Sequence, residues 1–163
     1  MRIVCAILLL AGGSLAVAQQ SRSKAAPNFT LKNLDGLEVS ATNFTGKTRL
    51  VFFWISTDKP CQRQLPALVE LQRDFAEAGV TVLGLTLDRP TNAAALKQFA
   101  ATNSVNFPIL FADYDAIIGF GGLEAIPTIA VVEPHGVIVE RYVGYTDKEV
   151  LRKLVQAILD SPR

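Results

Sequence analysis

Two kinds of apolar spacing alternate along the chain. Residues 50–55 and 80–87 are nearly continuous apolar runs rich in β-forming side chains, a pattern typical of strands covered on both faces. Over residues 60–78 the apolar positions recur every three or four residues, which predicts a helix that Gly79 ends. Residues 150–159 carry another stripe with helical spacing, and Asp147 is the expected start of that helix.

The remaining segments predict an α/β order in two parts. We expect short extended pieces at 29–31 and 37–39 around the turn Asp35-Gly36, a helix at 91–101, a strand at 107–111, a small helix at 115–118, and strands at 129–132 and 137–143. Residues 133–136 have the length and the residue types of a hairpin turn. This order predicts an α/β sandwich with a parallel first half and an antiparallel second half.

The N-terminal end has the pattern of a secretory signal. Arg2 is positive, residues 3–10 are apolar, and Ala16-Val17-Ala18 is a small-x-small pattern that predicts cleavage before Gln19. The alternative is an uncleaved anchor, but the apolar stretch 3–18 has 16 residues, fewer than the ~20 that span a bilayer. We expect an exported protein, periplasmic or otherwise extracytoplasmic, with a signal peptide at 1–18, a flexible tether at 19–26, one domain at 27–163 and no stable membrane span after cleavage.

Cleavage changes the charge and the cysteine count. Without Arg2 the chain holds 15 Lys and Arg against 15 Asp and Glu, so the mature net charge is zero and no basic field for nucleic acid is implied. Cys5 leaves with the signal, so Cys61 is alone and cannot form an internal disulfide. A lone cysteine in an oxidising compartment indicates either a buried inert thiol or intermolecular chemistry, including a dimer linked through Cys61.

The segment from Trp54 to Cys61 is the most informative motif. It follows an apolar strand and precedes a helix, and it reads Trp-x-x-x-Asp-x-Pro-Cys. The chain resembles the periplasmic TlpA/ResA-like thiol-disulfide reductases of the redoxin group, which carry Trp-x-x-x-Cys-x-Pro-Cys there. The segments that carry the resemblance are 26–31, Asp35-Gly36, 44–47, 50–54, Pro60-Cys61 with Pro66, 125–128 and Val143-Gly144.

The resemblance implies a thioredoxin fold, a central mixed sheet flanked by helices with a short N-terminal β-extension. It also implies a cis peptide bond between Ile126 and Pro127, beside a groove that offers backbone groups to an extended substrate. Asp58 occupies the position of the first, nucleophilic cysteine, and Asp is among the best helix N-caps. A dithiol reductase needs both thiols, so this chain keeps the frame and lacks the nucleophile.

The same resemblance implies the other site residues. Trp54, Thr57, Pro60, Ile126 and Pro127 are expected to line the substrate groove, although Trp54 is also interpreted as core. Thr57 stands where the family has an aromatic residue. Arg89 stands near the position of an acidic residue that assists proton transfer, and Asp88, one place earlier, is a candidate replacement.

Three functions remain open. The first is a non-redox module that binds protein or peptide segments in the cis-proline groove, and the second is a monothiol oxidoreductase that uses Cys61 with an external thiol. The third is a thiol peroxidase, which is disfavoured because Asp58, three residues before Cys61, would repel a thiolate. His135 is the only histidine and lies in a predicted turn, so a metal site of His and Cys ligands has no support. We also expect no other cofactor.

Overall fold

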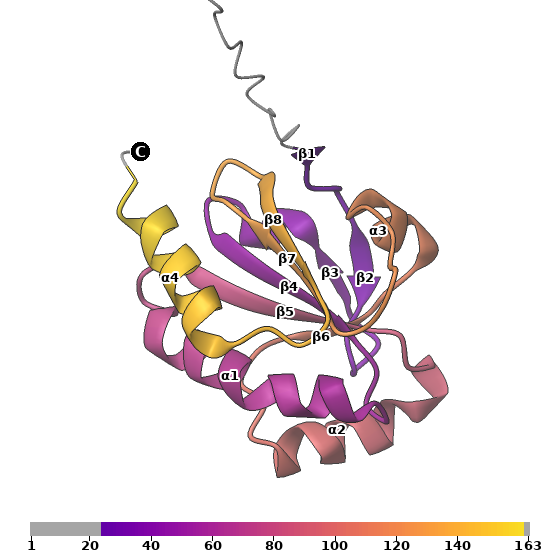
Figure 1. Ribbon diagram of the computed structural model, residues 1–163. Coiled ribbons are helices and arrows are strands. Elements are labelled where there is room, and N and C mark those ends of the chain that lie inside the picture. Colours follow the sequence, from indigo (N-terminus) through magenta and orange to yellow (C-terminus); the bar gives the residue numbers. More distant parts are fainter. Residues whose placement is uncertain (1–23, 162–163) are drawn as a thin grey trace, which may run out of the picture.

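The computed structural model describes residues 24–161 of the chain (Figure 1). Its strands are β1 (Lys24–Ala25), β2 (Thr30–Lys32), β3 (Glu38–Ser40), β4 (Thr48–Trp54), β5 (Val80–Thr86), β6 (Ile109–Phe111), β7 (Thr128–Val132) and β8 (Val137–Val143). Its helices are α1 (Lys59–Phe75), α2 (Ala93–Thr102), α3 (Tyr114–Gly119) and α4 (Lys148–Leu159), with short 3-10 helices η1 (Ala41–Phe44) and η2 (Pro90–Asn92). The expected signal peptide lies outside the described residues.

The central sheet has the mixed topology that the pattern predicts. Its strand order is β1-β8-β7-β4-β5-β6, and β2 pairs with β3 in a separate hairpin. Strands β4, β5 and β6 run parallel, whereas β7 is antiparallel to both β4 and β8. None of the helices within residues 24–161 is both long enough and apolar enough to cross a membrane.

The expected tether is wrong at its C-terminal end. Lys24 and Ala25 form β1 and pair with Ile138 and Val137 at the edge of the sheet. The Ala26 N–H continues this attachment by donating to the Gly136 carbonyl at 2.8 Å. These backbone hydrogen bonds do not depend on apolar side chains, so the small polar residues of this segment gave no strand signal.

Strand β4 separates two cores, because its side chains alternate between the faces of the sheet. Leu50, Phe52 and Trp54 pack with α1, α2 and α4, whereas Val51 and Phe53 pack with β2, η1 and α3. Figure 1 shows α1, α2 and α4 on one side of the sheet and α3 with the hairpin on the other. Burial on both faces explains why the β4 sequence is continuously apolar.

Element boundaries differ from the expectations by a few residues. The predicted strand over 107–111 begins only at Ile109, because Pro108 has no N–H to donate to a ladder. The Pro108 carbonyl still accepts a hydrogen bond from the Gly84 N–H at 2.9 Å. Helix α1 ends at Phe75, so the turn that leads to Gly79 is longer than the apolar spacing suggests.

Candidate functional site

The candidate site lies where β4 ends and α1 begins. Asp58 is the N-cap of α1, with extended backbone angles, and its Oδ2 accepts from the Cys61 N–H at 2.9 Å. Pro60 sits in the first helical turn, where its missing N–H costs nothing. The helix cap predicted from the sequence is therefore present at Asp58.

Cys61 is fully buried in the core beneath this cap. Burial raises the pKa of its thiol to about 12, and the carboxylates of Asp58 and Asp88 act in the same direction. A thiol with such a pKa is protonated at neutral pH, and the thiolate is the nucleophile in disulfide exchange. Asp58 thus caps the helix and places a negative charge that disfavours the Cys61 thiolate.

Asp88 fixes the turn that precedes α1. Its carboxylate accepts from the Ser56 N–H at 2.8 Å and from the Ser56 hydroxyl at 2.9 Å, and the Thr86 hydroxyl donates to it at 2.8 Å. The Gln62 side chain donates to the Ser56 carbonyl at 2.7 Å from the other side. Asp88 is therefore bound into the scaffold, and Arg89 beside it is exposed.

The peptide bond between Ile126 and Pro127 is cis, as the resemblance implies. The Pro127 carbonyl accepts from the Gly144 N–H at 2.7 Å, which fixes this loop to the end of β8. Pro127 is buried, whereas Ile126 is half-buried and packs against the core cluster that contains Cys61. The Ile126 N–H and carbonyl have no hydrogen-bond partner within residues 24–161.

A buried amide connects the cis-proline side of the site to α1. Gln64 is fully buried on α1; its Nε2 donates to the Thr146 carbonyl at 3.0 Å, and its Oε1 accepts from the Thr146 N–H at 2.8 Å. Because Gly144 binds Pro127, the segment 144–146 holds the loop and the helix together. Gln64 was not predicted as a site residue. A glutamine on the apolar face of a helix does indicate a buried side chain that needs hydrogen-bond partners.

The exposed part of the site is a shallow hollow beside α1. Lys59, Pro60 and Arg63 line a cavity of about 280 Å³, and the Arg63 guanidinium lies 3.9 Å from the centre of the Tyr145 ring. Thr57 is also exposed, in the turn between β4 and α1. Tyr145 directly follows Gly144, whose N–H binds the Pro127 carbonyl, so this ring and the Arg63 guanidinium lie on the cis-proline side of α1.

Trp54 does not line this groove, so its assignment to the groove is wrong. Its side chain is fully buried, stacks on Phe52 with ring centres 5.7 Å apart, and contacts Phe99 at 5.8 Å. Side chains alternate between the two faces of β4, so Trp54 lies on the same face as Phe52, in the core that α1 covers. The interpretation of Trp54 as a core residue is confirmed.

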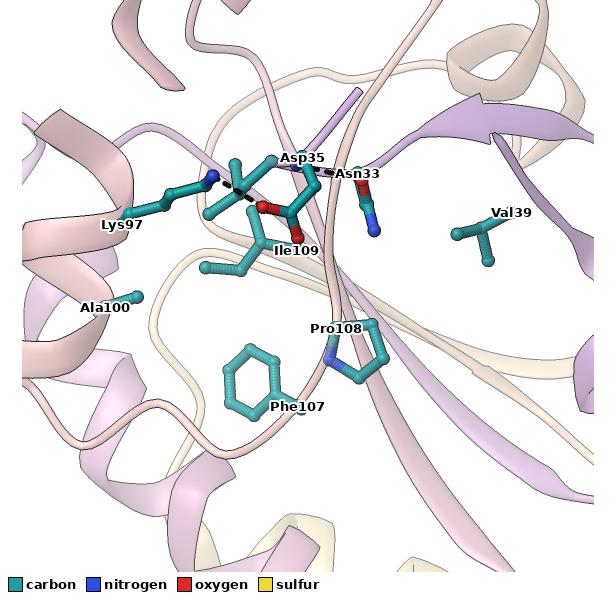
Figure 2. Close-up of a pocket in the computed structure, with 9 residues that line it drawn as sticks. Asn33, Asp35, Val39, Lys97, Ala100, Phe107, Pro108 and Ile109 are labelled. Carbon is teal, nitrogen blue, oxygen red and sulfur yellow. Dashed lines mark hydrogen bonds and ion pairs between the residues drawn. The ribbon is translucent and has the colours of Figure 1, made fainter. Parts of the chain in front are cut away.

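A separate cavity of about 470 Å³ lies away from the motif. It opens between the β2–β3 hairpin, α2 and β6, and its walls are largely apolar (Figure 2). Lys97 and Asp35 form an ion pair of 2.5 Å across it. None of the predicted site residues lines this cavity. Within residues 24–161 no group of three or more His, Cys, Asp or Glu is arranged to hold a metal.

Comparisons with known proteins agree with this architecture. A model of the AhpC/TSA family matches residues 23–141. The thiol-disulfide oxidoreductase ResA of Bacillus thuringiensis (strain Al Hakam) is 30% identical over 135 residues, covering 83% of this chain and 77% of that protein. The thioredoxin-like protein YneN of Bacillus subtilis (strain 168) is 33% identical over 130 residues, covering 79% and 76%.

Solved structures support the same fold. The chain is similar to a thiol:disulfide interchange protein of the thioredoxin family from Chlorobium tepidum TLS, with a TM-score of 0.75 and 27% identity. That match covers 85% of this chain and 98% of the other. The predicted thioredoxin fold is therefore confirmed.

Proposed function

The chain belongs to the AhpC/TSA family, and we propose that it binds an extended polypeptide segment beside the cis-proline without carrying out dithiol chemistry. Its relatives include thiol-disulfide oxidoreductases. The observation that carries the proposal is the start of α1, where the Asp58 carboxylate caps the helix and the remaining thiol, Cys61, is buried. Cys61 is the only cysteine among residues 24–161, and once Cys5 has left with the expected signal peptide a single thiol cannot close a disulfide within the chain.

The binding surface needs no thiol. The unpaired N–H and carbonyl of Ile126 are the groups that an extended segment pairs with when it adds alongside a backbone. Tyr145 is exposed next to Gly144, which binds this loop, and Thr57 and Pro60 are exposed close to the start of α1, so these side chains are free to contact the segment. The loop is held by the Gly144 and Gln64 hydrogen bonds, so the surface is preorganised. The signal pattern at residues 1–18 supports a location outside the cytoplasm.

Titration of the isotope-labelled protein with carboxymethylated insulin B chain tests this proposal, because that extended polypeptide contains no thiol. We expect saturable NMR shifts at the amides of Ile126, Gly144 and Tyr145, and unchanged affinity in Cys61→Ser. Tyr145→Ala should weaken binding several-fold, whereas Tyr114→Ala should not, because Tyr114 is exposed on α3 away from the groove. Absence of saturable shifts at the loop would remove the proposal.

A monothiol oxidoreductase is the second candidate, and burial of Cys61 argues against it. Its distinguishing product is a mixed disulfide between Cys61 and a substrate thiol. Incubation with insulin B chain activated as a mixed disulfide, followed by mass spectrometry, detects that product. We expect little adduct in the folded protein, because the thiol is inaccessible and protonated.

A further inference from the structure

A buried arginine lies at the opposite end of β4 from the thiol. Arg49 is the second residue of this strand, between Thr81 of β5 and Val132 of β7. Only 6% of its surface is exposed. It points to the same face as Val51 and therefore belongs to the side of the sheet that η1 and α3 cover, not to the side of Cys61.

The Arg49 guanidinium has no counter-ion within residues 24–161. It forms no ion pair and no hydrogen bond there, and its buried Nε has no acceptor. Residues 1–23 contain no Asp or Glu that could pair with it. Burial lowers the pKa of Arg49, but a guanidinium remains charged in proteins. A buried charge without a partner is strongly unfavourable, so binding an anion would stabilise this guanidinium.

A cavity adjoins this guanidinium. It has a volume of about 290 Å³ and lies between the segment that follows β1, η1 and the turn between β7 and β8. Asn28 and His135 line it, and neither side chain forms a hydrogen bond within the described chain. Gly136 closes one wall, where a Cβ would lie 3.7 Å from the Arg49 Nη2. The Thr45 hydroxyl on the rim already donates to the Thr42 carbonyl.

We propose that this cavity binds a compact oxyanion, a carboxylate or a phosphate group, held by the Arg49 guanidinium. The planar fork of an arginine can donate two parallel hydrogen bonds to such a group. The Asn28 amide and the His135 ring are the further donors on the wall, since the Thr45 proton is already engaged. The site is independent of the proposed groove, because it lies at the other end of β4.

Calorimetric titration of the full chain at constant ionic strength tests the site, with inorganic phosphate and acetate as two separate probes and chloride as background. We expect saturable binding of at least one probe, and the stronger one assigns the site to phosphate or to carboxylate chemistry. Arg49→Gln should weaken it at least ~10-fold, in line with the loss of a charge-assisted bidentate contact. Lys47→Gln removes the same charge from an exposed position two residues away and should change the affinity less than twofold.

A second variant and a direct signal keep the test decisive if Arg49→Gln does not fold. His135→Ala changes an exposed turn residue and should weaken binding several-fold while the fold is kept. In the parent protein, the NMR signal of the Arg49 Nε–H should shift saturably with the bound probe. Failure of both probes to saturate, or equal affinity in Arg49→Gln and the parent, would overturn the proposal.

Discussion

At the residue scale, the chemistry of the site depends on Asp58 and Cys61. The Asp58 carboxylate accepts a hydrogen bond from the Cys61 N–H at the start of α1. The same carboxylate disfavours ionisation of the Cys61 thiol, after burial the main cause of its raised pKa. An aspartate at this position therefore supplies no nucleophilic sulfur and makes the Cys61 thiol harder to ionise.

The first prediction concerns the cap. Asp58→Ala should lower the free energy of unfolding by ~1 kcal/mol, because the Cys61 N–H loses its acceptor. Asp58→Asn should retain most of the stability, since an amide oxygen can also accept. Urea unfolding of the three proteins at neutral pH measures this. Equal stability of Asp58→Ala and the parent would contradict the capping role.

The second prediction concerns pH. The pKa of Cys61 is raised from 9.0 to about 12 in the folded chain, so above pH 9 the unfolded thiol ionises while the folded one stays protonated. The contribution of the thiol to stability is therefore complete below pH 9 and is lost as the pH rises toward 12. The parent should lose up to about 1.4 kcal/mol per pH unit more than Cys61→Ala over this window. If the stability of the two proteins fell in parallel from pH 8 to pH 11, the folded chain would not be keeping the Cys61 thiol protonated.

At the element scale, the site is held by contacts between segments that are distant in sequence. Gln64 on α1 exchanges two hydrogen bonds with the backbone of Thr146, and Gly144 binds the carbonyl of Pro127. These bonds give the cis-proline loop a fixed position relative to α1, although no residue of the Cys61 motif takes part in them.

The third prediction tests this connection. Gln64→Leu keeps the approximate size of the side chain but leaves the Thr146 N–H and carbonyl buried without partners, which should cost ~1–3 kcal/mol of stability. Gln98→Ala, at an exposed position on α2, should change stability by less than ~0.5 kcal/mol. Denaturant unfolding compares the two variants, and a loss no larger for Gln64→Leu than for Gln98→Ala would contradict the role of this pair.

Local signals predicted the elements, whereas the tertiary contacts of the site could not be predicted. The apolar run of β4 and the capping Asp58 depend on near neighbours in the sequence, so both were predicted. The partner of Gln64 lies 82 residues away, and no local pattern specifies it. Trp54 was assigned to the groove because the motif begins there, but the face of β4 on which it lies depends on how α1 packs.

At the scale of the whole molecule, the two ends of strand β4 differ chemically. The end with Cys61 carries the cis-proline loop and the Asp58 cap, while the other end buries Arg49 beside a cavity. The AhpC/TSA match and the thioredoxin fold are consistent with the helix start at Asp58 and the cis-proline loop beside it. A frame of this kind can position a bound chain even when it performs no exchange reaction.

The most direct test is insulin disulfide reduction with dithiothreitol as the reductant, for the parent, Asp58→Cys and Cys61→Ser. We expect that neither the parent nor Cys61→Ser raises the rate above that of dithiothreitol without protein. Asp58→Cys should accelerate the reaction measurably, because it restores a thiol at the helix start, three residues from Cys61. Catalysis by the parent as fast as by Asp58→Cys would show that the chain performs disulfide exchange without a thiol at residue 58.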